Sequence, residues 1–99
     1  MKSYPLQKLA HAMSGSLLQG GEDCVISAGV STDTRCLPAG AMFFALKGEN
    51  FDAHHFLAEA VEAGAGALVL QDDSDLPEGI PVILVNDTLK ALQALAKWY

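Results

Sequence analysis

The chain is poor in positive charge. It has six lysine and arginine residues against twelve aspartate and glutamate residues, and its net charge is −6. This balance argues against nucleic acid and against anionic membranes as partners, because both bind to basic faces. It leaves room for an anionic small ligand, which must be met locally by a few placed cations and backbone N–H groups. The single arginine, Arg35, marks the first place to look for such a site.

Long apolar runs are also lacking. The continuous ones, such as residues 65–70, have the length of a strand, far short of the roughly 18–20 residues that span a bilayer. The first residues contain no continuous apolar run and no small-residue cleavage site, so we expect an ordinary start and not a signal peptide. The two cysteines, Cys24 and Cys36, have a spacing that matches no metal or redox motif. Two reduced thiols in a cytoplasmic protein are expected, with a disulfide as the alternative.

Glycine-rich phosphate motifs are absent from the sequence. It contains no GxxxxGK[ST] and no GxGxxG, and the Gly64–Ala65–Gly66 stretch precedes a predicted strand instead of opening a helix. We therefore predict no nucleoside-triphosphate site and no catalytic residue for phosphoryl transfer within these 99 residues.

The length suits one domain, residues 1–99, and about half of its residues are apolar. A first helix is predicted from an apolar face made of Leu6, Leu9, Ala10 and Met13. Pro5 suits its first turn and Gly15 its C-terminal stop. Two short strand-like pieces, residues 17–18 and 25–26, then flank a glycine turn at residues 20–21.

The second half alternates buried strands and helices. Strands are predicted at residues 41–46, 65–70 and 81–86, because each is a short continuous apolar run. Asp52 is predicted to cap a helix that continues to Gly64, and Asp87 to cap a last helix. The predicted apolar faces are Phe56, Leu57, Ala60 and Val61 in the first of these helices, and Leu89, Leu92, Leu95 and Ala96 in the second. Residues 72–78 carry four carboxylates and are predicted to be a surface loop. The pattern predicts a three-layer α/β domain with a mixed, mostly parallel sheet.

Polar side chains gather in two segments that each follow a predicted strand. STDTR, residues 31–35, follows Val30, and KGENF, residues 47–51, follows the strand at 41–46. Ligands of open α/β sheets bind beyond the carboxyl ends of the strands, so we expect the two segments to face each other there. The candidate binding residues are Ser31, Thr32, Asp33, Thr34, Arg35, Lys47, Gly48, Glu49, Asn50 and Phe51.

These residue types suit a ligand that resembles a sugar nucleotide. Hydroxyl and amide groups of Thr32, Thr34 and Asn50 can bond a base or a ribose, and Phe51 can lie flat on a base or close the core. Arg35 or Lys47 can meet a diphosphate. The alternative is a plain polar turn, in which Asp33 bonds its own backbone and Arg35 pairs with a carboxylate. The residues alone leave both interpretations open.

A metal site is not expected at DAHH, residues 52–55. Neighbouring histidines at a helix start do not easily point at one ion, and the sequence offers no further ligand cluster.

Four blocks of the sequence together resemble the Mur ligase family of bacterial peptidoglycan synthesis. They are GVSTDTR (29–35), LPAGAMFFALKGENFDAHHF (37–56), AVEAGAGALVL (60–70) and PVILVNDTLKALQALAKWY (81–99). The wording GENFDAH favours the branch that joins D-alanyl-D-alanine to UDP-N-acetylmuramoyl tripeptide. The alternatives are the branch that adds the third amino acid, and a stand-alone interaction domain of the same fold. Ala53 stands where many relatives carry glycine, which implies a slightly stiffer loop.

The resemblance implies that this domain holds the UDP end of a UDP-N-acetylmuramoyl peptide. It places uridine contacts on Thr32, Thr34 and Arg35 and on Glu49, Asn50 and Phe51. It also implies a central domain with a P-loop, ATP and Mg²⁺, and a C-terminal domain for the incoming amino acid or dipeptide, both outside these 99 residues. The expected reaction activates the peptide carboxylate as an acyl phosphate, which the incoming amine attacks. We therefore expect no cofactor in this domain and no ligase activity from it alone.

Overall fold

A mixed five-stranded sheet forms the centre of the described part of the chain. The computed structural model describes residues 4–19, 25–26, 29–32, 37, 39–46, 57–71 and 79–98. The strands are β2 (Ser16–Gln19), β4 (Val30–Ser31), β5 (Met42–Phe44), β6 (Ala67–Leu70) and β7 (Val82–Leu84), in the order β2-β7-β6-β5-β4. Strands β4 to β7 run parallel, and β2 pairs antiparallel with β7. The prediction of a mixed, mostly parallel sheet is confirmed.

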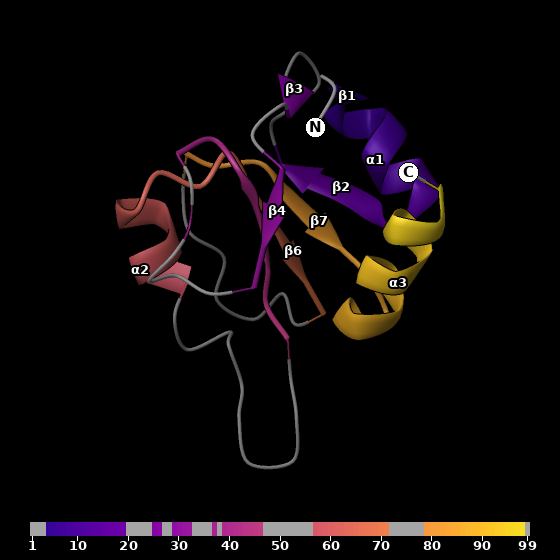
Figure 1. The fold of residues 1–99 in the computed structure, drawn as a ribbon. Helices are drawn as coiled ribbons and strands as arrows, with labels where there is room; N and C mark the ends of the chain where they lie inside the picture. The colour runs from indigo at the N-terminus through magenta and orange to yellow at the C-terminus, as the bar shows by residue number, and fades with distance from the viewer. Residues whose placement is uncertain are drawn as a thin grey trace.

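Helices cover the sheet on both faces (Figure 1). Helices α1 (Leu6–Ala12) and α3 (Thr88–Trp98) lie on one face, and α2 (Leu57–Glu62) lies on the other. A second, two-stranded sheet pairs β1 (Tyr4–Pro5) with β3 (Val25–Ile26). The three-layer α/β prediction is therefore confirmed. The predicted strand pieces on either side of the glycine turn both exist, but β2 and β3 belong to different sheets.

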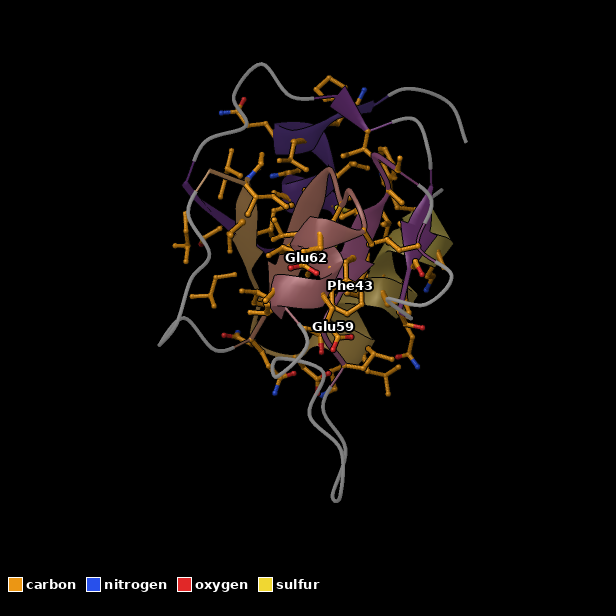
Figure 2. All side chains as sticks on the ribbon, turned by 90° about the vertical axis from the view of Figure 1, so that its left-hand side faces the viewer. Phe43, Glu59 and Glu62 are labelled. Atoms are coloured by element: carbon orange, nitrogen blue, oxygen red, sulfur yellow. The ribbon has the colours of Figure 1, made fainter. Side chains whose placement is uncertain are left out.

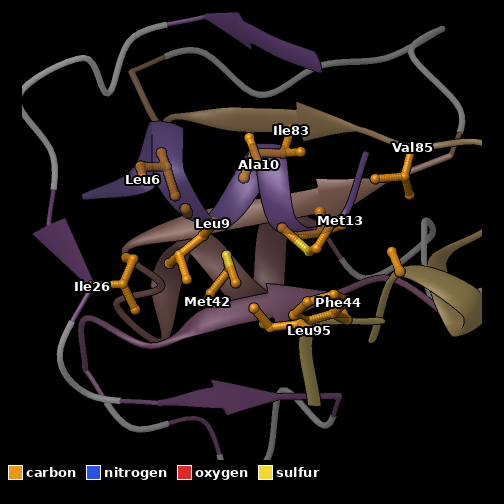
Figure 3. Packing of buried hydrophobic residues seen from close by; sticks show 13 residues of the cluster. Leu6, Leu9, Ala10, Met13, Ile26, Met42, Phe44, Ile83, Val85 and Leu95 are labelled. Carbon is orange, nitrogen blue, oxygen red and sulfur yellow. The ribbon is translucent and has the colours of Figure 1, made fainter. Parts of the chain in front are cut away.

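Alternating side chains of the inner strands supply two separate apolar clusters. The larger one packs α1 and α3 against one face of the sheet (Figure 3); its buried members are Leu6, Leu9, Ala10, Met13, Ile26, Met42, Phe44, Ala67, Val69, Ile83, Val85, Ala91 and Leu95. The smaller cluster lies under α2 and consists of Phe43, Ala45, Leu57, Ala60, Leu68, Leu70, Ile80 and Val82. Residues of one strand thus serve both layers, which explains why β5 and β6 read as continuous apolar runs.

The first helix has the predicted face but a different ending. Its predicted apolar residues are all buried. The backbone leaves the helix at Ser14, whose φ of 55° is left-handed. The N–H of Ser14 donates to the carbonyl of His11, and the N–H of Gly15 donates to that of Ala10, as in a Schellman motif. The helix ends just before Gly15 as predicted, but the left-handed residue that ends it is Ser14. A Cβ at Gly15 would lie 2.7 Å from Ile83 Cγ2, so this glycine is required by close packing on β7.

The last helix begins as predicted but buries a different face. The Asp87 Oδ1 accepts the N–H of Lys90 at 3.1 Å, which confirms the predicted N-cap. Thr88, Ala91 and Leu95 are the buried residues of α3, whereas Leu89 is 52% exposed. The predicted inward orientation of Leu89 and Ala96 is therefore wrong, because the helix is turned so that Thr88 faces the sheet.

The middle helix is described from Leu57 onward. Leu57 and Ala60 are buried as predicted, but Val61 is exposed. Figure 2 looks onto this layer, with Glu59 and Glu62 on α2 in front of Phe43. The predicted cap Asp52, the apolar Phe56 and the acidic segment 72–78 lie outside the described residues.

Candidate functional site

The carboxyl ends of four parallel strands meet at one edge of the sheet. The register pairs Ser31 with Phe43, Phe43 with Leu68, and Leu68 with Val82. Because these parallel strands point in the same direction, the residues that directly follow β4, β5, β6 and β7 all lie at this edge. This is the position at which open α/β sheets bind ligands.

Two of the ten candidate residues lie in the described part of the chain. Ser31 is the last residue of β4 and is partly buried, and Thr32 follows it in an exposed bend. The other eight, Asp33, Thr34, Arg35, Lys47, Gly48, Glu49, Asn50 and Phe51, lie outside the described residues. Their assignment as binding residues stays a prediction.

The starting points of the two candidate segments are neighbours. Strands β4 and β5 are adjacent and parallel, and the N–H of Met42 donates to the carbonyl of Gly29 at 3.0 Å. Residues 31–35 begin at the carboxyl end of β4, and residues 47–51 follow Leu46 at the carboxyl end of β5. The sheet therefore places Ser31 and Leu46, the residue before the second segment, at the carboxyl ends of adjacent strands.

A third group at the same edge was missed by the sequence reasoning. The side-chain oxygen of Gln71, just after β6, accepts two hydrogen bonds from Thr88 at the start of α3. The Thr88 N–H donates at 3.0 Å and its hydroxyl at 3.1 Å. The sequence carried no signal for this contact, because the two residues are 17 positions apart.

The described part of this edge offers hydrogen-bonding groups and little charge. Ser31, Thr32 and Gln71 carry hydroxyl or amide groups, which suit the polar atoms of a base, a sugar or a phosphate. Within the described ranges, no three histidine, cysteine, aspartate or glutamate side chains come together as a metal site requires. His54 and His55 lie outside those ranges.

The helices in the described part of the chain are all too short or too polar to cross a bilayer.

Comparison with known proteins relates the chain to a family. The family model described as "Mur ligase family, catalytic domain" matches residues 27–99. The chain is 46% identical over 96 residues to the UDP-N-acetylmuramoyl-tripeptide–D-alanyl-D-alanine ligase of Bacillus subtilis, which covers 95% of the chain and 21% of that relative. The UDP-N-acetylmuramoyl-L-alanyl-D-glutamate–2,6-diaminopimelate ligase of Clostridium perfringens is 31% identical over 94 residues, 95% of the chain and 19% of that relative.

Solved structures give the same relationship. A crystal structure of MurF from Acinetobacter baumannii superposes with a TM-score of 0.81 at 32% identity, covering 95% of this chain and 20% of that one. The chain spans about a fifth of the length of the relatives it matches. Since the family model covers most of the sequence and the fold agrees, the chain belongs to the Mur ligase family.

Proposed function

We propose that this chain is the substrate-anchoring domain of a MurF-type ligase. In this proposal it binds the UDP part of UDP-N-acetylmuramoyl tripeptide, to which the whole enzyme adds D-alanyl-D-alanine. The observation that carries the proposal is the 46% identity to a relative named for that reaction, over nearly the whole chain. The adjacent carboxyl ends of β4 and β5 support it, because the two predicted binding segments begin there.

The proposed contacts divide by chemistry. The hydroxyls of Thr32 and Thr34 and the amide of Asn50 bond the uracil edge or the ribose, and Phe51 stacks on the base. Arg35 or Lys47 meets the diphosphate. Ser31, Asp33, Gly48 and Glu49 complete the two segments. The net charge of −6 makes these local cations essential for holding an anionic ligand.

The remaining chemistry is assigned to the rest of the enzyme. ATP and Mg²⁺ act in a central P-loop domain, and the amine substrate is placed by a C-terminal domain. The proposed place of the reaction is the cytoplasm. This domain supplies binding energy remote from the reacting carboxylate, which contributes to catalysis by positioning the peptide. The 99 residues by themselves are expected to form no amide bond.

The second candidate is a ligase that adds the third amino acid of the peptide. The 31% identity to the Clostridium perfringens relative supports it less strongly. Both candidates share the UDP end of the substrate, so the amine consumed by the complete enzyme distinguishes them. Consumption of D-alanyl-D-alanine supports the first, and consumption of diaminopimelate or lysine supports the second.

An NMR titration of the 99-residue chain tests the proposed anchor directly. UDP is added first, and UDP-N-acetylmuramoyl tripeptide in a separate series. We expect amide shifts confined to residues 31–35 and 47–54. If neither ligand shifts these amides at millimolar concentration, the titration is repeated on a chain extended through the P-loop domain. No response there either would overturn the proposal.

A further inference from the structure

The contact between Gln71 and Thr88 joins two elements that are distant in sequence. Thr88 is 1% exposed and is the buried polar side chain of the described core. Both its N–H and its hydroxyl donate to the same oxygen, Gln71 Oε1, across 17 positions of the chain. A buried hydroxyl must be hydrogen-bonded to offset its desolvation, so burial of Thr88 depends on Gln71.

This contact gives α3 a second cap. The first turn of a helix leaves its N–H groups without intrahelical partners. Asp87 satisfies the N–H of Lys90 locally, and Gln71 satisfies the N–H of Thr88 from the end of β6. Asp87 already caps the helix locally, so the bond from Gln71 has a different consequence. It fixes the end of a strand to the start of a helix.

The same contact fixes the orientation of the Gln71 amide. Its oxygen receives both donors and therefore faces α3, and alternation along β6 puts Gln71 on the same face of the sheet as Val69. The end of β6 thus has one defined geometry at the carboxyl edge.

Gln71 also lies beside the carboxyl end of β5. The register pairs Phe44 with Val69, and the N–H of Ala45 donates to the carbonyl of Val69. Continued by two residues, this register puts Gln71 opposite Leu46, directly before Lys47. On its other side the N–H of Val85 donates to the carbonyl of Leu70. The contact between Gln71 and α3 therefore lies beside Leu46, the last described residue after β5.

We propose that Gln71 and Thr88 are positioning residues for nucleotide binding. Their hydrogen bonds hold the carboxyl ends of β6 and β7 and the start of α3 as one rigid corner beside the carboxyl end of β5. This proposal rests on the proposed function, since it assumes that the nucleotide lies at this edge. A preformed edge lowers the ordering cost that a ligand must otherwise meet on binding. Loss of the Gln71–Thr88 hydrogen bonds should therefore lower the affinity for the nucleotide by increasing motion of this edge, with no ligand contact removed.

Thr88→Val and Thr88→Ser form a matched pair for the test. Valine keeps the shape and removes the hydroxyl, whereas serine keeps the hydroxyl and removes one methyl group. In the ligand-free 99-residue chain, amide hydrogen exchange at residues 45–46, 71 and 85 is compared with exchange in the centre of β6. We expect Thr88→Val to exchange faster at these edge amides only, and Thr88→Ser to remain close to the parent chain.

UDP affinity is then measured at a temperature where every variant is fully folded. We expect Thr88→Val to bind UDP about three to ten times more weakly, a loss within the worth of the one internal hydrogen bond removed, and Thr88→Ser to recover most of the affinity. A purely structural role predicts a lower Tm with unchanged UDP affinity and unchanged edge exchange, and that result would overturn the proposal.

Gln71→Glu separates positioning from direct contact. The carboxylate keeps an oxygen for both Thr88 donors and gains from the positive end of the α3 dipole, but it loses the amide nitrogen. Near-parental UDP affinity and edge exchange support positioning. A parental Tm and exchange with UDP binding that stays strongly weakened at high salt, where repulsion by the new charge is screened, would overturn it, since the amide nitrogen would then contact the ligand.

Failure of the proposed function gives a different pattern. If the parent chain and its extended form do not bind UDP, the anchor role is wrong. The exchange comparison then still decides whether the Gln71–Thr88 hydrogen bonds order the edge. Faster exchange at the edge amides alone in Thr88→Val would support the rigid corner. Exchange that changes equally at the edge and in the centre of β6 would contradict it.

Discussion

Ser14 holds a conformation that L-amino acids seldom adopt. Its φ of 55° lies in the left-handed region, where glycine is favoured because it has no Cβ. The glycine stands one position later, where a Cβ would press on Ile83 and Val85. Two neighbouring positions therefore both favour glycine, and only the one under steric pressure from the core has it.

Ser14→Gly is expected to stabilise the protein by about 1 kcal/mol. The substitution removes the left-handed cost of a side chain, a gain partly offset by the greater freedom of glycine in the unfolded chain. Urea unfolding measures the change, with Ser14→Ala as the control that keeps a Cβ and should bring no gain. A less stable Ser14→Gly chain would show that the serine side chain makes a bond worth more than the strain.

Gly66→Ala is expected to lower the free energy of unfolding by about 1–3 kcal/mol. The new Cβ would lie 2.5 Å from the carbonyl oxygen of Gly40, which is backbone and has little freedom to move. Gly64→Ala is the comparison, because it adds strain at φ +95° but finds Ala39 only at 3.5 Å. Chemical denaturation should rank Gly66→Ala as the more damaging change, and equal losses would mean that close approach is not the cause.

Thr34→Val is expected to weaken UDP binding by about 1–2 kcal/mol through loss of one hydroxyl bond. Thr34 belongs to the predicted segment that follows β4. Calorimetry on the folded variant gives the affinity, and Ser16→Ala, on the exposed side of β2, is the control. Unchanged affinity would remove Thr34 from the proposed site.

At the scale of elements, α3 shows two independent determinants. Its start is local, since Asp87 caps Lys90 three residues away. The rotation of α3 about its axis is set by a tertiary contact. Thr88 faces the sheet, where it is bonded to Gln71, and Leu89 consequently faces outward. The leucine spacing alone indicated a face centred nearer to Leu92. The error arose because a buried threonine is favourable only when a partner is present, and that partner lies 17 residues away.

Asp87→Ala is expected to cost about 1 kcal/mol of stability by leaving the Lys90 N–H without its cap. Asp87→Asn keeps a capping oxygen and should lie within a few tenths of a kcal/mol of the parent chain. Thermal or urea unfolding measures both. Equal losses in the two variants would assign the effect to the charge of Asp87 and not to the hydrogen bond.

At the scale of the whole molecule, protection should decrease from the centre of the sheet outward. Strand β6 lies between β5 and β7, and all its residues are buried. The two-residue pair of β1 and β3 is small by comparison. We expect amide hydrogen exchange to be slowest in β6 and its neighbours and fastest in the β1–β3 pair. Equal protection of the two sheets would mean that the described domain opens only as one unit.

The candidate site was predictable to different degrees. Adjacency of the segments after β4 and β5 followed from apolar runs and from the rule that parallel strands end at one edge. The Gln71–Thr88 tie did not follow, since nothing local marks two polar residues separated by β7 as partners. For eight of the ten candidate residues the assignment still rests on the sequence and its resemblance to the family.

The sequence by itself determined the three buried strands of the second half, the α1 face, the Asp87 cap and the α/β class, because apolar period and capping depend on residues a few positions apart. Only the tertiary structure decided the rotation of α3, the need for glycine at positions 15 and 66, and the allocation of β2 and β3 to different sheets. These features depend on which atoms meet across the core. These contacts arise from the packing of segments that are distant in sequence, and no local pattern predicts them.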